Sequence, residues 1–244
     1  MKQIADNVYS LGASSHNFYF LVDADQATIV DAGCSREWSQ LAGGLDSLDL
    51  ALESVAGIVA THAHADHFGL AKQAQDEGLS VSVHGDEETR ALGTYEGRFA
   101  VDASDLPKFN WHALRTFLPM IRAGVTRLDH LDHVGIFTDG DQLQLPGRPV
   151  AVHTPGHTEG HTMFHCPDLG FLFTGDGLIT KDLLGSGTGP QMIEERFNLD
   201  NDRALASLDR IVDLEASLLL PGHGEPWPGS PARAVELVRN RNRS

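Results

Sequence analysis

The stretch THAHADH, residues 61–67, places three histidines and one aspartate within one short segment. It overlaps the end of GIVATH, residues 57–62, an apolar run that predicts a strand buried on both faces. In an extended loop alternate side chains face the same way, so His62, His64 and Asp66 converge while His67 points elsewhere. Such polar groups are costly to bury without a shared partner. One loop of this kind can therefore serve two neighbouring metal ions.

Three later segments supply further candidate ligands, each at the end of a predicted strand and each next to glycine. They are His157 in HTPGHTEGH (153–161), Asp176 in FTGDG (173–177) and His223 in LLPGHGE (219–225). Glycine lets the backbone turn sharply and approach a ligand closely. His153 and His161 flank His157, and two roles stay open for them: ordinary packed or solvated histidines, or supports behind the ligands. Histidine and carboxylate together suit zinc, and also iron or manganese.

The pattern H-x-H-x-D-H, followed by H, D and H in separate loops, resembles the metallo-β-lactamase superfamily of metallohydrolases over essentially the whole chain. The resemblance implies an α/β (α+β) fold, a four-layer αβ/βα sandwich with metals at one edge between the sheets. It implies two divalent metal ions, with zinc as our first choice. The implied ligands are His62, His64 and His157 for the first ion, Asp66, His67 and His223 for the second, and Asp176 as the bridge.

Two metal ions about 3.5–4 Å apart can hold a hydroxide and lower the pKa of bound water from ~15.7 towards ~7. We expect this bridging hydroxide to attack the carbonyl of an ester, thioester or lactone. Asp66 is the expected catalytic residue, which takes up the proton and passes it to the leaving group. Asp31, in IVDAG, resembles the family's carboxylate that orients a ligand histidine, but capping the turn before Gly33 is an equal alternative.

Composition limits the partners. The formal net charge of −16 repels phosphate backbones and anionic membranes, so we expect a small-molecule substrate, no nucleic acid and no membrane. The start MKQIADNVYSLG lacks the pattern of a secretory signal, which predicts a cytoplasmic product. Cys34 and Cys166 are expected as reduced, packed residues. The sequence leaves the oligomeric state open.

Patterning predicts one domain, residues 1–244, with a helical insertion at about 86–133. The insertion carries helical patterns at 86–93 and 110–118, interrupted by Pro107 and Pro119, and ends in the loop DHLDH, 129–133. We expect Phe109, Trp111, Phe117 and Met120 to form the core of a small helical lobe. Strands are expected within 18–33 and at 57–62, 79–85, 134–137, 141–145, 149–154, 161–166, 170–176 and 217–224; helices are expected at 35–45, 68–78, 200–214 and 231–240, with Ser35, Asp200 and Ser230 as caps.

Several reactions fit this family pattern. The commonest β-lactamases use cysteine where this chain has Asp176, and acyl-homoserine lactonases usually carry tyrosine where it has Ile179. Glyoxalase II matches TPGHTEGH and FTGD, although only a short segment follows His223. We favour a glyoxalase-II-like thioesterase or esterase. The alternatives are a lactonase, a mononuclear iron persulfide dioxygenase and a non-catalytic binding module.

Overall fold

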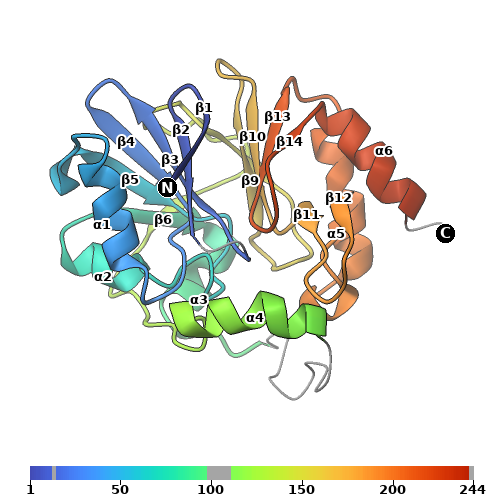
Figure 1. Ribbon diagram of the computed structural model, residues 1–244, viewed down its shortest axis with the longest axis horizontal. Coiled ribbons are helices and arrows are strands. Elements are labelled where there is room, and N and C mark those ends of the chain that lie inside the picture. The colour runs from blue at the N-terminus through green and yellow to red at the C-terminus, as the bar shows by residue number, and fades with distance from the viewer. Residues whose placement is uncertain (13–14, 98–110, 242–244) are drawn as a thin grey trace.

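Two β-sheets face each other and helices cover their outer faces, as Figure 1 shows for the computed structural model. The structure describes residues 1–12, 15–97 and 111–241. This arrangement is the predicted four-layer sandwich of helix, sheet, sheet and helix. None of the helices in the described ranges is long and apolar enough to cross a membrane.

The first sheet has seven strands in chain order, β1 to β7. They are β1 (Lys2–Ala5), β2 (Val8–Leu11), β3 (Phe18–Asp23), β4 (Gln26–Val30), β5 (Val55–Val59), β6 (Val81–His84) and β7 (Gly135–Phe137). Strands β1 to β4 pair antiparallel, and β4 to β7 pair parallel. The carboxyl ends of β4, β5 and β6 therefore meet at one edge, where the loop 61–67 begins.

The second sheet has the order β14-β13-β10-β9-β8. Its strands are β8 (Val150–His153), β9 (Thr162–Cys166), β10 (Phe171–Gly175), β13 (Leu218–Pro221) and β14 (Trp227–Pro228). Strands β10 and β13 run parallel, so the loops that carry Asp176 and His223 leave the sheet at the same edge. A separate two-stranded hairpin, β11 (Ile179–Lys181) with β12 (Thr188–Gln191), follows β10.

Three apolar clusters hold the layers together. Between the sheets, Tyr19 and Val59 of the first pack with Phe164 and Phe173 of the second. Helices α1 (Trp38–Asp46) and α2 (Ala71–Asp76) cover the first sheet, and α5 (Asn201–Ser207) and α6 (Pro231–Arg241) cover the second. Asp200 caps α5 by accepting from Arg203 N at 2.9 Å, and Ser230 caps α6 by accepting from Arg233 N at 3.3 Å, as predicted.

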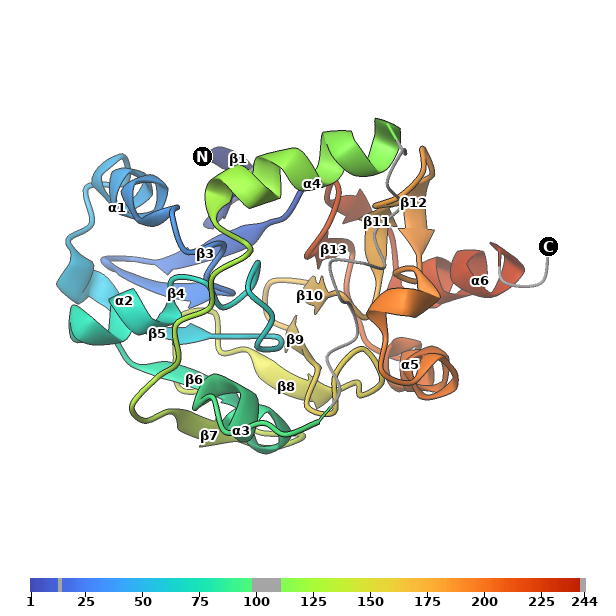
Figure 2. The same ribbon diagram turned by 90° about the horizontal axis from the view of Figure 1, so that it is seen from below.

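The two helices of the predicted insertion lie in different parts of the fold. Helix α3 (Glu88–Ala91) packs against β6, whereas α4 (Trp111–Ala123) lies across the open edge of both sheets (Figure 2). Pro119 lies inside α4 and does not end it, contrary to the prediction. The loop 129–133 is a loop as predicted, with His130, Asp132 and His133 exposed.

The aromatic core predicted for the insertion is only partly correct. Met120 is buried, and the ring of Phe117 lies 6.1 Å from that of Phe197. The prediction for Trp111 is wrong, because this residue is 71% exposed. It lies on the face of α4 that points away from the protein, and Leu114 and Ile121 on the same face are exposed too. Phe109 lies outside the described residues.

Two local predictions also fail. Residues 141–145 form only an isolated antiparallel bridge between Gln142 and Val150, made by the bonds from Leu143 N to Pro149 O and from Ala151 N to Asp141 O, both at 2.9 Å. Ser35 does not cap α1; its hydroxyl donates to Gly124 O at 3.0 Å instead. Strands β1, β2, β11, β12 and β14 were not predicted, because each is short and lacks a long apolar run.

Candidate metal centre

Three histidines bring nitrogen atoms to one point at the sheet edge. His157 Nε2 lies 3.2 Å from His62 Nε2 and 3.0 Å from His64 Nδ1. A four-coordinate zinc ion with bonds of about 2.0–2.1 Å to nitrogen keeps its ligands roughly 3.3 Å apart. The three nitrogens therefore have the mutual spacing of ligands around one ion, with His64 facing it through the opposite ring nitrogen from the other two.

A second group lies beside the first. Asp66 Oδ2 is 3.7 Å from His67 Nε2 and 3.4 Å from His223 Nε2. Asp176 lies between the two groups: its Oδ2 is 3.5 Å from His157 Nε2 and 3.2 Å from His223 Nε2, and its Oδ1 is 3.3 Å from His67 Nε2. The structure thus brings all seven predicted ligands together. That they bind metal remains a prediction.

The loop after β5 reaches both groups because it changes conformation halfway. No regular structure covers His62 to His64, and after them the chain turns, with His67 N and Phe68 N both bonding His64 O, at 3.0 and 2.8 Å. This turn brings His67 back towards the centre, where the alternation rule placed it on another face. One strand end therefore supplies His62 and His64 to the first group and Asp66 and His67 to the second.

Four of the five histidines are held from behind through Nδ1. The partners are Thr61 Oγ1 for His62 (3.0 Å), Asp31 Oδ2 for His67 (2.8 Å), Asn198 Oδ1 for His157 (3.1 Å) and the carbonyl of Ser15 for His223 (2.5 Å). Carboxylate, amide and carbonyl oxygens accept, and the Thr61 hydroxyl accepts because it donates its own proton to Asp31, so each of these Nδ1 atoms carries a proton and each Nε2 faces the centre. Asn198 and Ser15 were not predicted, since nothing in the sequence near them marks a site.

Asp31 combines the two roles that the sequence left open. Its backbone has a left-handed φ of 63°, as in a tight turn. Its Oδ2 accepts from His67, and its Oδ1 accepts from Thr61 N at 2.7 Å and Thr61 Oγ1 at 3.0 Å. A single carboxylate therefore orients one candidate ligand and fixes the start of the loop that carries four.

His161 supports the loop that carries Asp176. Its Nε2 accepts from the backbone N–H groups of Asp176 and Gly177, both at 3.1 Å, while its Nδ1 lies 2.9 Å from Thr154 Oγ1. The ring is buried, and burial lowers its pKa to about 4. His161 therefore stays neutral and accepts from the loop that positions Asp176, whereas His153 contacts the carbonyl of Glu159 and stacks on His84.

Glu87 joins two ligand loops and was not predicted. It is fully buried at the start of the insertion. Its Oε2 accepts from Ala63 N at 2.9 Å and its Oε1 accepts from Gly160 N at 3.0 Å. One carboxylate therefore ties the loop of His62 and His64 to the loop of His157. Glu87 lies in the polar run DEET, and nothing in that run indicates that this glutamate is buried between two loops.

Burial keeps the three histidines of the first group neutral. Burial lowers the pKa of His62 well below its usual range, that of His64 to about 3 and that of His157 to about 4. Burial alone would raise the pKa of Asp176, but His223 and His67 lower it well below its usual range. Near neutral pH the first group therefore offers uncharged imidazoles, and Asp176 offers an ionised carboxylate. At His67 and His223 burial lowers the pKa, but Asp176 and Asp66 raise it above its usual range, so a cation bound there would displace a proton from each ring.

Two buried atoms of the centre make no hydrogen bond, which tests whether a cation fits there. In the described part of the chain, His67 Nε2 and Asp176 Oδ1 make no hydrogen bond. A side chain at Gly222 would come within 2.5 Å of Asp176 Oδ1 and 2.6 Å of His67 Cε1, so the backbone itself closes this side. Buried polar atoms without partners are costly. Divalent cations between the two groups would satisfy both, and the donor set fits them.

Comparison with known proteins settles the family. The sequence profile of the metallo-β-lactamase superfamily matches residues 11–223, a span that contains every candidate ligand. The chain belongs to the metallo-β-lactamase superfamily. It is therefore a metal-dependent hydrolase of that superfamily, whose members bind divalent metal ions.

Relatives in the superfamily are distant. The "Probable metallo-hydrolase YqjP" of Bacillus subtilis (strain 168) is 28% identical over 91% of this chain and 72% of its own length. The "Probable metallo-hydrolase YflN" of the same strain is 23% identical over 99% of this chain and 92% of its own. Among solved structures, a metallo-β-lactamase family protein of Thermus thermophilus is 27% identical, with a TM-score of 0.69 over 98% of this chain and 80% of that one. The B3 metallo-β-lactamase BLEG-1, at 22% identity, a TM-score of 0.64 and coverage of 94% and 96%, shares the fold.

Proposed function

We propose that this superfamily member is a dinuclear hydrolase that cleaves a thioester or ester of a small molecule. The observation that carries the proposal is the position of Asp176. Its Oδ2 lies 3.5 Å from a histidine of the first group and 3.2 Å from a histidine of the second. Because this carboxylate lies beside two groups of candidate ligands, it supports a site for two metal ions rather than the single-iron site of a dioxygenase.

Bound at these residues, two divalent ions would supply a Lewis acid for the carbonyl oxygen and a water of lowered pKa. The chain offers no thiol for that attack. Cys34 and Cys166 are buried, and burial raises the pKa of the Cys34 thiol far above its usual range and that of Cys166 to about 12. Water is therefore the nucleophile that fits the structure.

Asp66 is the residue to which we assign proton transfer. Its carboxylate lies next to His67 and His223, and its side chain keeps 13% of its surface exposed, more than the 4% of Asp176. It can therefore reach both the centre and an incoming substrate. Its role is to accept a proton from the attacking water and return it to the leaving group.

A substrate panel tests the proposal. Metal-replete protein is assayed with matched thioesters, oxygen esters and lactones, and with a penicillin because the fold is shared with β-lactamases. We expect turnover of the thioester or ester, loss of that turnover after chelation, and recovery when metal returns. Turnover that survives chelation would contradict the proposal, as would one iron per chain with oxygen uptake on a persulfide.

A further inference from the structure

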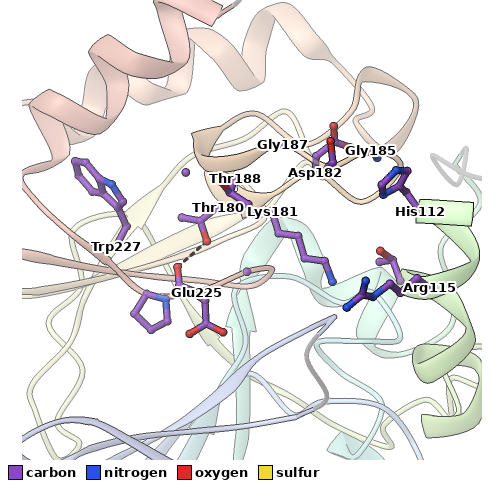
Figure 3. A pocket seen from close by; sticks show the side chains of 15 residues that line it. His112, Arg115, Thr180, Lys181, Asp182, Gly185, Gly187, Thr188, Glu225 and Trp227 are labelled. Carbon is purple, nitrogen blue, oxygen red and sulfur yellow. Dashed lines mark hydrogen bonds between the residues drawn. The ribbon is translucent and has the colours of Figure 1, made fainter.

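A cavity of about 520 Å³ lies beside the metal centre. Figure 3 shows its walls, which come from α4, from the β11–β12 hairpin and from the segment after His223. None of the seven candidate ligands lines it. It is therefore a compartment separate from the centre.

The cavity nevertheless continues directly from two ligand loops. Gly224 lines it and directly follows His223, and Thr180 lines it four residues after Asp176. Thr180 N donates to His223 O at 3.0 Å, and Thr180 Oγ1 donates to Glu225 O at 2.6 Å. One wall of the cavity is thus built by the residues that follow His223 and Asp176 along the chain, so the cavity adjoins the centre.

Two cations from different elements meet in this cavity. Arg115 comes from α4 and Lys181 from the end of β11, and their side chains point towards each other (Figure 3). Burial, and after it repulsion by Arg115, lowers the pKa of Lys181. Holding like charges together costs free energy, and an anion between them would offset that cost. The chain as a whole carries a net charge of −16, so two neighbouring cations are a local exception to its acidic character.

The acidic residues of the cavity wall are engaged with other groups. Asp182 Oδ1 accepts from Leu184 N at 2.9 Å and from Gly185 N at 2.6 Å, within its own hairpin. Glu225 forms an ion pair with Lys2 at 2.7 Å. The cavity therefore presents a cationic end formed by Arg115 and Lys181. At its other end it presents the indole ring of Trp227 (Figure 3).

We propose that Arg115 and Lys181 bind an anionic end group of the substrate, a carboxylate or a phosphate, while its scissile carbonyl lies at the metal centre. The inference rests on the proposed hydrolase function. The planar guanidinium of arginine matches either anion with two parallel hydrogen bonds, and lysine adds a point charge. The insertion that carries Arg115 thereby determines substrate choice.

Matched substrates test the inference in catalysis. The probes are the S-phenyl thioester of adipic acid, its methyl ester, and an analogue with a phosphonate in place of the free carboxylate. In wild-type protein we expect kcat/KM for an anionic probe to exceed that for the methyl ester roughly tenfold or more, through KM. Arg115→Ala and Lys181→Ala should bring the ratio close to one and leave the methyl ester unaffected. Comparison of the carboxylate with the phosphonate identifies the preferred anion.

Arg122→Ala is the matched control, since Arg122 is an exposed arginine of the same helix that does not line the cavity. It should keep the wild-type ratio. A wild-type ratio near one with both esters cleaved overturns the inference and leaves the hydrolase proposal standing. An unchanged ratio in both Arg115→Ala and Lys181→Ala also overturns it.

A binding measurement separates the two proposals if no thioester is cleaved. Calorimetry on metal-replete protein compares hexanesulfonate, a weak metal ligand, with hexanol. We expect hexanesulfonate to bind wild type and Arg122→Ala, and to bind Arg115→Ala and Lys181→Ala at least tenfold more weakly. Equal binding to all four proteins overturns the inference whatever the catalytic result, whereas the expected pattern supports it even if the hydrolase proposal fails.

Discussion

Asp31 contacts both a ligand histidine and the backbone of the loop that carries it, so its charge and its shape can be tested separately. Asparagine tolerates the left-handed backbone at φ 63°. Asp31→Asn should therefore fold normally. Because it loses the anionic acceptor of His67 Nδ1–H, it should weaken binding of the ion at His67 about 10–100-fold.

A competition titration with a chromophoric chelator measures that affinity. Asp49→Asn is the matched control, because Asp49 is exposed and has a similar φ of 56°. It should keep wild-type affinity. Wild-type affinity in Asp31→Asn as well would show that Asp31 acts only in the turn.

Asp66 is tested by a change that keeps its size. Asp66→Asn removes the proton acceptor, so kcat should fall roughly 10²-fold or more, the usual contribution of a positioned acid–base group. The measurement is the rate with the preferred thioester at saturating metal. Metal content is measured in parallel, and a normal rate in fully loaded Asp66→Asn would remove Asp66 from the mechanism.

Individual residues also show which parts of the site could be predicted from the sequence. The six-position motif predicted His62, His64 and Asp66 together, because strand alternation is local. Alternation alone placed His67 on another face, because it does not foresee the turn after His64, whereas the family pattern correctly grouped His67 with the other candidate ligands. Asn198 could not be found, because it lies 41 residues from His157 and only the fold brings the two side chains together.

At the scale of elements, Glu87 makes the start of the insertion part of the centre. Glu87→Ala would leave the N–H groups of Ala63 and Gly160 buried without an acceptor. We expect the free energy of unfolding to fall by roughly 2–4 kcal/mol, measured by urea denaturation. Glu88→Ala, at an exposed position in the next turn, should change it little. Equal effects of the two variants would contradict this role.

Asp182 in the β11–β12 hairpin and Glu194 just after it form a carboxylate pair with a pH-dependent contribution to stability. Leu184 N donates to both Asp182 Oδ1 and Glu194 Oε1, at 2.9 and 2.8 Å. Burial, and after it the contact with Asp182, raises the pKa of Glu194 to about 7. A raised carboxyl pKa means that Glu194 stabilises the fold below its ordinary pKa, and that this contribution is lost as pH rises through about 7.

Glu194→Gln mimics the protonated form, so it should remove this loss. Relative to Glu194→Gln, wild type should lose about 2 kcal/mol of unfolding free energy between pH 5 and pH 8. Urea denaturation across that pH range measures it. Glu195→Gln, at the exposed neighbouring position, should follow wild type. Parallel curves for wild type and Glu194→Gln would contradict the assignment.

Among the elements, long apolar strands and capped helices were predictable and short edge elements were not. Asp200 and Ser230 cap their helices as their sequence positions indicate, because capping is a local interaction. Residues 141–145 alternate like a strand, yet they pair with the start of β8 through a single bridge. Alternation indicates which side chains face inward and does not give the length of the pairing.

At the scale of the whole molecule, the metal centre joins the two halves of the sandwich. The first sheet supplies four candidate ligands through one loop, and the second sheet supplies His157, Asp176 and His223. The fold class was predictable because the order and spacing of these residues are those of the superfamily. The path of α4 across the open edge was not, since its amphipathic pattern does not say which surface it covers.

Metal removal should therefore destabilise the entire fold. A ligand present at about 100 times its dissociation constant stabilises a protein by about 2.7 kcal/mol, which corresponds to a shift in Tm of roughly 5–10 °C for a chain of this size. Differential scanning calorimetry before and after chelation measures it. An unchanged Tm would show that the ions do not link the two sheets.

Metal stoichiometry tests the central claim most directly. Elemental analysis by mass spectrometry of protein reconstituted with zinc and freed of excess metal should give two ions per chain for wild type. It should give one ion for His64→Ala or His223→Ala, each of which removes a ligand of one group only. One ion or none in wild type, or two ions in both variants, would contradict a paired cation centre built from these seven side chains.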